Sequence, residues 1–331
     1  MSPRKKRILQ GLVGLIVLVL LPALLSSGFL VSLGINPLFG IFPKPAMPVV
    51  SLTPEPLPGL GITNSILATL LVDVVLLAIV FAGTRKLRAG SPDAWVPTGL
   101  QNALEAVLET LYNLGESVLG ERTRQLFWLG ATIFLFLLIA NWSELVPFVE
   151  SVGFIEEVHG EDVEGYAKSS FLGIPAVVPP EEDEPGEYTL IPLFRVPTTD
   201  LNLPLALALI SVFMTQVYGV RALGVKGYLA RFFPIGSIKK KRWMGLIDIF
   251  VGILELISEV AKIISFTFRL FGNLFAGGVL LFVMAFLIPL VFVGGVVFYG
   301  LELFVGLIQA FIFMMLTFAF TASATMEHGE H

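Results

Sequence analysis

One arginine, Arg269, stands inside the sequence SFTFRLFGNLFAGGVLL, residues 265–281, which is otherwise apolar enough for the interior of a bilayer. A charged side chain near the middle of a membrane helix costs from about 3 to more than roughly 10 kcal/mol, depending on its access to water. Arginine cannot avoid this cost by releasing its proton, because its pKa lies above about 12. Such residues normally mark the path of an ion or a substrate, so we expect Arg269 to be functional.

The polar residues near Arg269 fall on one face of a helix. Residues three and four positions apart in a helix are neighbours. Counting back from Arg269 in such steps gives polar residues, namely Glu255, Ser258, Lys262 and Ser265. Counting forward gives Asn273 and then small residues, which would let another helix come close. These small residues are Gly272, Ala276 and Gly277. Static packing between helices is the alternative explanation for the small residues alone.

The composition excludes a single soluble domain. Of the 331 residues, 55% are hydrophobic and only 14% are charged, which is typical of an integral membrane protein with several helices. Cysteine is absent, which excludes disulfides and thiolate metal sites. The histidines, His159, His328 and His331, lie outside the apolar segments. The sequence therefore predicts no bound metal and no cofactor.

Residues 1–62 are predicted to contain a membrane helix followed by an external connection. A basic cluster at residues 4–7 precedes an apolar run over residues 8–33. This run is longer than the roughly 7–15 residues of a signal-peptide core and lacks a clear cleavage site, which favours a retained helix over a cleaved signal segment. Residues 34–62 are rich in proline and glycine and are expected to lie against the membrane surface. Residues 63–331 would form the main membrane domain.

Three further spans are predicted before the C-terminal third of the chain, at residues 64–82, 126–146 and 198–220. The first contains Asp73, which is either a functional carboxylate or a hydrogen-bonded packing residue. Between the first two, residues 96–119 combine apolar residues at helical spacing with interleaved glutamates. This pattern predicts an amphipathic helix on the membrane surface. Polar residues stand at or beside the outer ends of the later two spans, namely Asn141, Glu144, Thr198 and Asp200.

The distribution of charge predicts an orientation. Basic residues gather at residues 4–7, 85–88 and 221–242, whereas residues 150–190 are rich in acidic residues. By the positive-inside rule, the basic segments and both termini are cytoplasmic, and residues 34–62 and 150–197 face outward. We interpret the acidic segment as a solvated external loop, with metal binding as a minor alternative.

The last third is predicted to be a hairpin of two long apolar segments, residues 245–289 and 293–324. At about 1.5 Å per residue the first would exceed roughly 60 Å, about twice the hydrocarbon thickness. Either it breaks into shorter helices, or it lies strongly tilted with its polar face covered by protein or water. Glu302 and Gln309 share one face of the second segment, which would turn toward the face of Arg269. The fold class is therefore an all-α integral membrane protein with about five to six membrane helices.

Four strings closely resemble subunit a of the F-type ATP synthase. They are FRLFGNLFAG at residues 268–277, LIQAFIF at 307–313, TDLN at 199–202 and NWSELVP at 141–147. The similarity covers the chain from about residue 62 to its end. It implies a multi-pass subunit of a bacterial-type plasma membrane, with no enzymatic activity of its own. The implied partners are the c-subunit ring, b-type stator stalk subunits and the rest of the synthase in the lipid bilayer, and no nucleic acid.

The resemblance also implies a role for each candidate residue. Arg269 would be the essential arginine that exchanges protons with the carboxylates of the rotating ring, because a fixed positive charge stabilises a carboxylate in its ionised form. The outer half-channel would contain Asn273, Glu302, Gln309, Asn141, Glu144, Thr198 and Asp200. The inner half-channel would contain Glu255, Ser258, Lys262 and Ser265. The residues facing the ring would be Gly272, Ala276 and Gly277.

The chain departs from one form of the family pattern. Some members of the family carry Glu at the position of Gly278 and His at the position of Glu302, whereas this chain has one carboxyl in place of that pair. Glu302 is then either the titratable group of the outer half-channel or part of a wide aqueous vestibule. A secondary ion transporter and a structural subunit of another membrane complex are the alternative functions. No internal repeat supports the first, and a passive scaffold would not need the polar face around Arg269.

Overall fold

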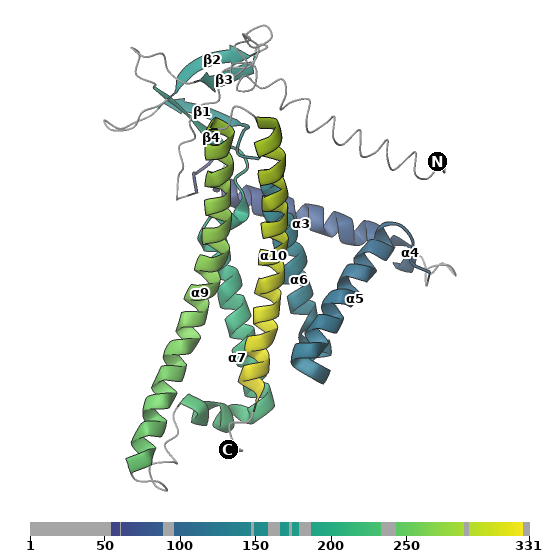
Figure 1. Cartoon of the computed structure of the whole chain (residues 1–331), viewed down its shortest axis with the longest axis vertical. Coiled ribbons are helices and arrows are strands. Elements are labelled where there is room, and N and C mark those ends of the chain that lie inside the picture. The colour runs from purple at the N-terminus through teal and green to yellow at the C-terminus, as the bar shows by residue number, and fades with distance from the viewer. Residues whose placement is uncertain are drawn as a thin grey trace. The chain divides into compact units, whose positions relative to one another are not determined.

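The computed structural model describes residues 54–59, 61–88, 96–146, 149–157, 166–171, 174–178, 187–232, 243–287 and 291–326. Its helices, labelled as in Figure 1, are α3 (Asn64–Gly83), α4 (Arg85–Arg88), α5 (Leu100–Leu119), α6 (Thr123–Trp142), α7 (Asn202–Phe232), α9 (Trp243–Leu287) and α10 (Val291–Thr325). Short 3₁₀ helices are η3 (Gly120–Arg122), η4 (Ser143–Leu145) and η5 (Pro197–Thr199). The predicted span at residues 8–33, with its alternative as a signal segment, lies outside the described residues.

Helices dominate the described residues, and four of them are long and apolar enough to cross a membrane. These are α3, the stretch Leu100–Leu145 that ends in α6 and η4, α7, and α10 from Val297 onward. Many apolar side chains on these helices are exposed, such as Val74 at 62% and Phe213 at 66%, as lipid surroundings require. The long helix α9 lies between α7 and α10 in the sequence. The chain is therefore an all-α integral membrane protein, as predicted.

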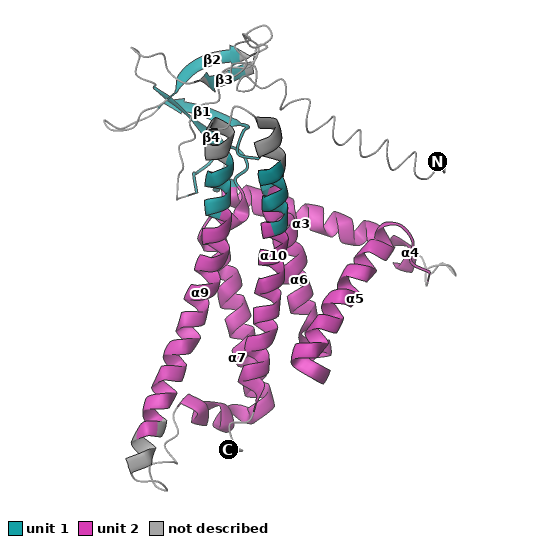
Figure 2. Cartoon of the chain, viewed as in Figure 1, with its two compact units in different colours: residues 1–64, 144–195, 275–304 teal, residues 65–143, 196–274, 305–331 magenta. Residues whose placement is uncertain are grey.

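The chain forms two compact units, coloured separately in Figure 2. Unit 1 contains residues 1–64, 144–195 and 275–304, and unit 2 contains residues 65–143, 196–274 and 305–331. Helices α9 and α10 each contribute residues to both units. The predicted division of the chain at residue 62 stays a prediction.

The core of unit 2 is built from α3, α5, α6, α7, α9 and α10. The α9 residue Phe266 stacks on Phe313 of α10, with ring centroids 4.6 Å apart. Gly130 of α6 lies directly against the ring of Phe318, so a side chain there would clash with α10. Between α7 and α10, buried hydroxyls pair at 2.8 Å (Ser211–Thr317) and 3.2 Å (Thr215–Thr321). These contacts hold α7 and α10 close together inside an apolar core.

Helix α9 decides between the two predicted arrangements of its segment, and helix α7 is longer than predicted. Helix α9 is continuous over 45 residues, which corresponds to about 67 Å, so it does not break into shorter helices. Helix α7 does not end at residue 220 but continues to Phe232, with a kink at Gly224, whose φ is 72°. Glycine adopts this conformation without strain. The extension forms because Tyr228 and Phe232 are buried and pack edge to face at 5.4 Å.

Unit 1 contains four strands in the segment that we predicted to be a solvated loop. They are β1 (Gly153–Glu157), β2 (Ala167–Phe171), β3 (Ile174–Val178) and β4 (Tyr188–Pro192). β1 pairs with β4 and β2 with β3, both antiparallel. The backbone of Ile191 lies where a side chain of Gly153 would be, so glycine permits the first pairing. Two of the acidic residues that suggested a loop, Glu156 and Glu157, lie in β1 itself, so the prediction of a loop was wrong for the strands.

The start of α3 is fixed within unit 1 by one buried amide. The side chain of Asn64 accepts a hydrogen bond from the backbone N–H of Glu55 at 3.2 Å and donates one to the carbonyl of Pro192, also at 3.2 Å. It thereby ties β4 to the segment before α3. Burial raises the pKa of the neighbouring Glu55 carboxyl, while the Arg195 guanidinium opposes the shift.

Candidate functional site

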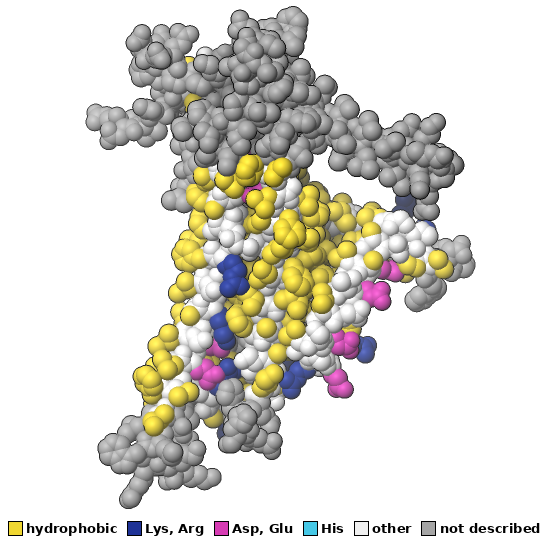
Figure 3. Space-filling view, viewed as in Figure 1, with side chains coloured by type: hydrophobic (Ala, Val, Ile, Leu, Met, Phe, Trp, Pro, Cys, Tyr) yellow, Lys and Arg dark blue, Asp and Glu magenta, His cyan; other side chains and the backbone are white. Residues whose placement is uncertain are grey.

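Arg269 lies on the face of α9 that is left uncovered. The opposite face packs into unit 2 through Phe266, Leu270 and Leu274, each at most 2% exposed. Beside Arg269, by contrast, Ile264 and Phe268 are 54% and 59% exposed. Figure 3 shows dark blue basic side chains along α9 next to yellow hydrophobic ones, with magenta acidic side chains beside the lower of them. The arginine is therefore presented on an apolar surface that is open to a membrane partner.

The Arg269 guanidinium has only a weak contact with its own helix. Its Nη2 lies 3.5 Å from the Ser265 hydroxyl, at the limit of a hydrogen bond. Within the described part of the chain, no carboxylate lies within ion-pair distance of it. A fixed positive charge on a lipid-facing surface is costly unless something outside the chain balances it. The Arg269 guanidinium can therefore form an ion pair with an anionic group of a partner.

The predicted polar and small neighbours of Arg269 divide into two groups. Ser258, Ser265, Asn273 and Ala276 are exposed on α9, and a side chain added at Gly272 would meet open space. Gly277 differs from its prediction as a ring-facing residue, because it is buried against the carboxyl of Glu302. Because Gly277 has no side chain, the carboxyl of Glu302 fits against α9, so this glycine accommodates a residue of its own chain and not a ring helix.

A charged cluster joins α9 to α7 in unit 2 and contains Glu259, which the sequence analysis missed. The Glu259 carboxylate accepts hydrogen bonds from Lys262 Nζ at 2.6 Å and from Gln216 Nε2 at 2.8 Å. Arg231 pairs with Glu255 and lies 4.0 Å from Glu259. Two acids face two bases, so the cluster is neutral. Glu259 stands three residues before Lys262 and four after Glu255, so the same spacing includes it, but the count back from Arg269 took Ser258 at this step.

This cluster changes the interpretation of the inner candidates. Glu255 and Lys262, predicted to line the inner half-channel, are held in ion pairs, and Lys262 also lies 4.9 Å from the ring of Phe320. Ser258 and Ser265 remain exposed on the same helix. The charged cluster therefore fixes α9 onto α7. Of the four inner candidates, only the two serines are exposed polar groups.

In unit 1 two carboxyl groups lie against two consecutive glycines of α9. A side-chain carbon at Gly277 would lie 2.5 Å from Oε1 of Glu302, and one at Gly278 would lie 2.8 Å from Oε1 of Glu144. Glu302 is only 6% exposed, and Glu144 Oε1 is buried without a hydrogen-bond partner among the described residues. The two carboxyls thus lie against neighbouring positions of the same helix. Each carboxyl therefore occupies the space that a side chain at the facing glycine would fill.

Other outer candidates lie in unit 2, where α6 meets α10. Asn141 donates a hydrogen bond to the carbonyl of Gly306 at 3.0 Å, while its Oδ1 has no partner among the described residues. Gln309, one turn further along α10, is 8% exposed. Thr198 in η5 is fully buried, and its hydroxyl also lacks a described partner. Asn141 and Thr198 thus keep unused hydrogen-bonding capacity of the kind that water or a proton path requires.

Asp200 has a different environment from the other outer candidates. Its carboxylate accepts hydrogen bonds from the Ser65 hydroxyl at 2.6 Å, the Asn202 backbone N–H at 3.0 Å and the Asn202 side chain at 2.9 Å. It therefore caps the start of α7 and ties it to the start of α3. This geometry favours an anchoring role over the predicted place in the half-channel.

Comparisons with known proteins agree over most of the chain. The model of the family described as ATP synthase A chain matches residues 66–322. The ATP synthase subunit a of Moorella thermoacetica is 27% identical over 267 residues, which are 81% of this chain and 93% of the relative. That of Mycobacterium bovis is 31% identical over 271 residues, 81% of this chain and 89% of the relative. That of Campylobacter hominis is 30% identical over 262 residues, 79% and 89%.

Proposed function

The chain belongs to the ATP synthase subunit a family, and from this we propose that it is the proton-channel stator subunit, with Arg269 as the residue that exchanges protons with a rotating ring of c subunits. The observation that carries the proposal is the position of Arg269. It stands on the uncovered face of α9, among exposed apolar side chains, with no described carboxylate to balance it. A carboxylate of a neighbouring ring helix would supply the missing negative charge.

The proposed step uses the fixed charge of Arg269. A ring carboxyl must cross lipid in its neutral form, because an ionised one costs several kcal/mol there. Beside the guanidinium the ionised form is stabilised, so the carboxyl releases its proton on one side and takes up another on the other side. The arginine keeps its own proton throughout and, as a positive charge, blocks direct proton flow between the two sides. Exposed Ala276 and open Gly272 would let the ring helices pass.

Two access routes are proposed, one on each side of Arg269. The outer route would use the carboxyl groups of Glu144 and Glu302, together with the polar groups of Asn141, Thr198, Gln309 and Asn273. The inner route follows Ser258 and Ser265 along α9, with Glu255 and Lys262 fixed beside them. Asp200 serves as an anchor. The chain itself carries out no phosphoryl chemistry, which would belong to other subunits.

The proposed setting follows the charge distribution of the sequence. Both termini and the basic segments would be cytoplasmic in a bacterial-type plasma membrane, and the strand-containing segment would be external. The partners would be the c-subunit ring, b-type stalk subunits and the rest of the synthase.

Replacement of Arg269 tests the proposal. We expect Arg269→Lys and Arg269→Ala to abolish ATP-driven proton pumping in inverted membrane vesicles while the complex still assembles. Lysine can neutralise when buried and lacks the planar fork that holds a carboxylate. Arg124→Ala removes an exposed arginine from α6 and serves as the matched control. Pumping by assembled Arg269→Ala at a rate near that of the parent would refute the proposed role.

A further inference from the structure

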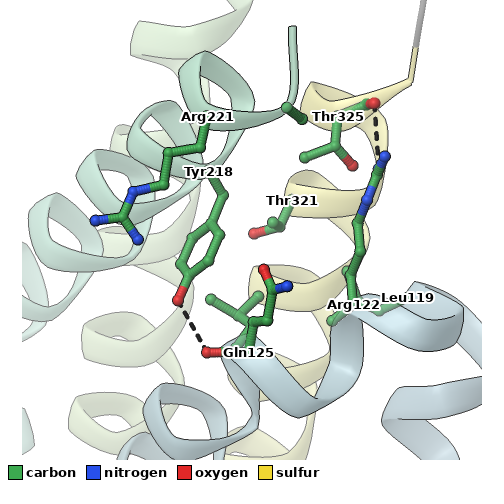
Figure 4. A pocket seen from close by; sticks show the side chains of 9 residues that line it. Leu119, Arg122, Gln125, Tyr218, Arg221, Thr321 and Thr325 are labelled. Carbon is green, nitrogen blue, oxygen red and sulfur yellow. Dashed lines mark hydrogen bonds between the residues drawn. The ribbon is translucent and has the colours of Figure 1, made fainter. Parts of the chain in front are cut away.

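A cavity of about 230 Å³ lies in unit 2, away from the residues that the proposed function uses. Figure 4 shows it between the start of α6, the middle of α7 and the end of α10. The residues that line it are Leu119, Arg122, Gln125, Leu126, Tyr218, Arg221, Ala222, Thr321 and Thr325.

The sequence places this cavity at the edge of the hydrocarbon layer. The apolar run of α6 begins at Leu126, that of α7 ends before Arg221, and that of α10 ends at Thr325. Three apolar helices therefore change to polar sequence around one cavity. Tyr218 stands at this boundary, where tyrosine is enriched in membrane proteins. The opening lies at the depth of lipid headgroups.

The charge of the lining is positive and uncompensated. Arg122 and Arg221 stand on opposite sides of Tyr218 in Figure 4, and the lining includes no acidic residue. Neither arginine forms an ion pair with any other described residue. Arg231 and Lys262, by contrast, are neutralised by glutamates within the same unit. The lining thus presents a positive charge on each side of the Tyr218 ring, that of Arg122 beside Thr325 and that of Arg221 beyond the ring.

The side chains around the cavity are partly held in place. Arg122 Nη1 donates a hydrogen bond to the carbonyl of Thr325 at 3.2 Å, which leaves its other N–H groups available. The Tyr218 hydroxyl donates to the carbonyl of Gln125 at 2.9 Å, which fixes the ring as a wall. The Arg221 guanidinium lies 5.8 Å from the centre of that ring. Little ordering is therefore needed when a ligand enters.

We propose that this cavity binds the phosphate group of an anionic phospholipid. A guanidinium matches phosphate with two parallel hydrogen bonds, and basic pockets between membrane helices near the surface are suited to lipid headgroups. The apolar lining residues Leu119, Leu126 and Ala222 would contact the glycerol region of the lipid. The volume is below the roughly 300–1,000 Å³ of sites for drug-sized molecules, so it fits a headgroup and not a whole lipid.

Lipid titration of the purified full-length chain in detergent tests this proposal. Native mass spectrometry would count bound molecules with three probes, which are phosphatidylglycerol, phosphatidylcholine and inorganic phosphate. The variants are Arg122→Gln, Arg221→Gln and their combination. Arg124→Gln removes an exposed arginine that does not line the cavity and is the matched control.

We expect the parent and Arg124→Gln to bind one phosphatidylglycerol more tightly than phosphatidylcholine. Each cavity variant should weaken that binding on the order of tenfold, the effect of losing one charged hydrogen-bonding partner. Arg221→Gln keeps the contact of Arg122 with Thr325, so it tests the site even if the double variant fails to fold. Equal binding of phosphatidylglycerol by Arg221→Gln and Arg124→Gln would overturn the proposal. Displacement of the lipid by millimolar inorganic phosphate would also overturn it, because the site would then serve free phosphate.

Discussion

At the scale of single residues, Gly277 and Gly278 make space for two carboxyl groups. Sequence spacing alone placed Gly277 among residues facing a partner, because a helical period says which face a residue occupies but not what lies there. The structure puts Glu302 against Gly277 and Glu144 against Gly278. The sequence analysis expected one carboxyl to serve alone here. Glu144 was already a candidate, but its approach to Gly278 depends on tertiary packing that no local pattern reveals.

Gly277→Ala should disturb this arrangement. The added carbon would lie 2.5 Å from Oε1 of Glu302, so the carboxyl or the helix must move. We expect a loss of thermal stability of about 1–3 kcal/mol, as for an overpacked core site, despite the better helix propensity of alanine. Thermal unfolding of the purified chain measures the effect. Gly272→Ala is the control, because open space surrounds Gly272 and the stability should not fall. Equal stability of both variants would contradict the close packing of Glu302.

Glu302→Gln tests whether this carboxyl transfers protons. Glutamine keeps the size of the side chain but removes the titratable group, so we expect proton flux through the stripped membrane sector to fall on the order of 100-fold. Glu302→His should restore part of the rate, because histidine can also carry a proton. Glu109→Gln, an exposed position on α5, is the control. Parental flux in Glu302→Gln vesicles would leave only the interpretation of Glu302 as part of an aqueous vestibule.

At the scale of elements, apolar length and period predicted the helices well. The predicted spans at residues 64–82 and 126–146 correspond to α3 and to α6 with η4, and the predicted amphipathic helix corresponds to α5. The predictions were less accurate where tertiary contacts decide. The end of α7 depends on buried Tyr228 and Phe232, and the pairing of β1 with β4 joins strands that are distant in sequence. Continuity of α9 also required a structure, because a segment about twice as long as the hydrocarbon thickness could either break or tilt.

Glu259→Gln tests whether the charged cluster fixes α9 onto α7. The substitution leaves Lys262 and Arg231 opposite Glu255 alone, and Glu259 and Lys262 have side chains that are only 8% and 14% exposed. Removing one partner of a buried ion pair costs about 3 kcal/mol, because an uncompensated charge remains. We expect a lower unfolding temperature, and the double variant Glu259→Gln/Lys262→Met should recover part of the loss. The neighbouring exposed Ser258→Ala should change little, and a similar change in both single variants would argue against the cluster.

At the scale of the whole molecule, the uncovered face of α9 carries a charge that the described residues of the chain do not balance. Apolar side chains continue along this helix on the cytoplasmic side of Arg269 in the proposed orientation, with Phe250 at 61% and Ile257 at 58% exposed. Lipid can cover these side chains but cannot balance the charge of Arg269. In the proposed function, the same helix that builds the core of unit 2 would also provide the surface for a partner with a carboxylate, which connects the fold to the proposed exchange of protons.

The orientation of the chain can be tested with single cysteines, because the parent sequence contains none. Glu187, beside β4, and Lys226, after the kink in α7, are both exposed. The positive-inside rule places them on opposite sides of the membrane. A membrane-impermeant maleimide should therefore label Glu187→Cys in right-side-out vesicles and Lys226→Cys in inverted vesicles. The unlabelled parent gives the background, and permeabilised vesicles show that both cysteines are reactive. Labelling of both variants from the same side would contradict the proposed topology, since an odd number of spans must separate the two positions.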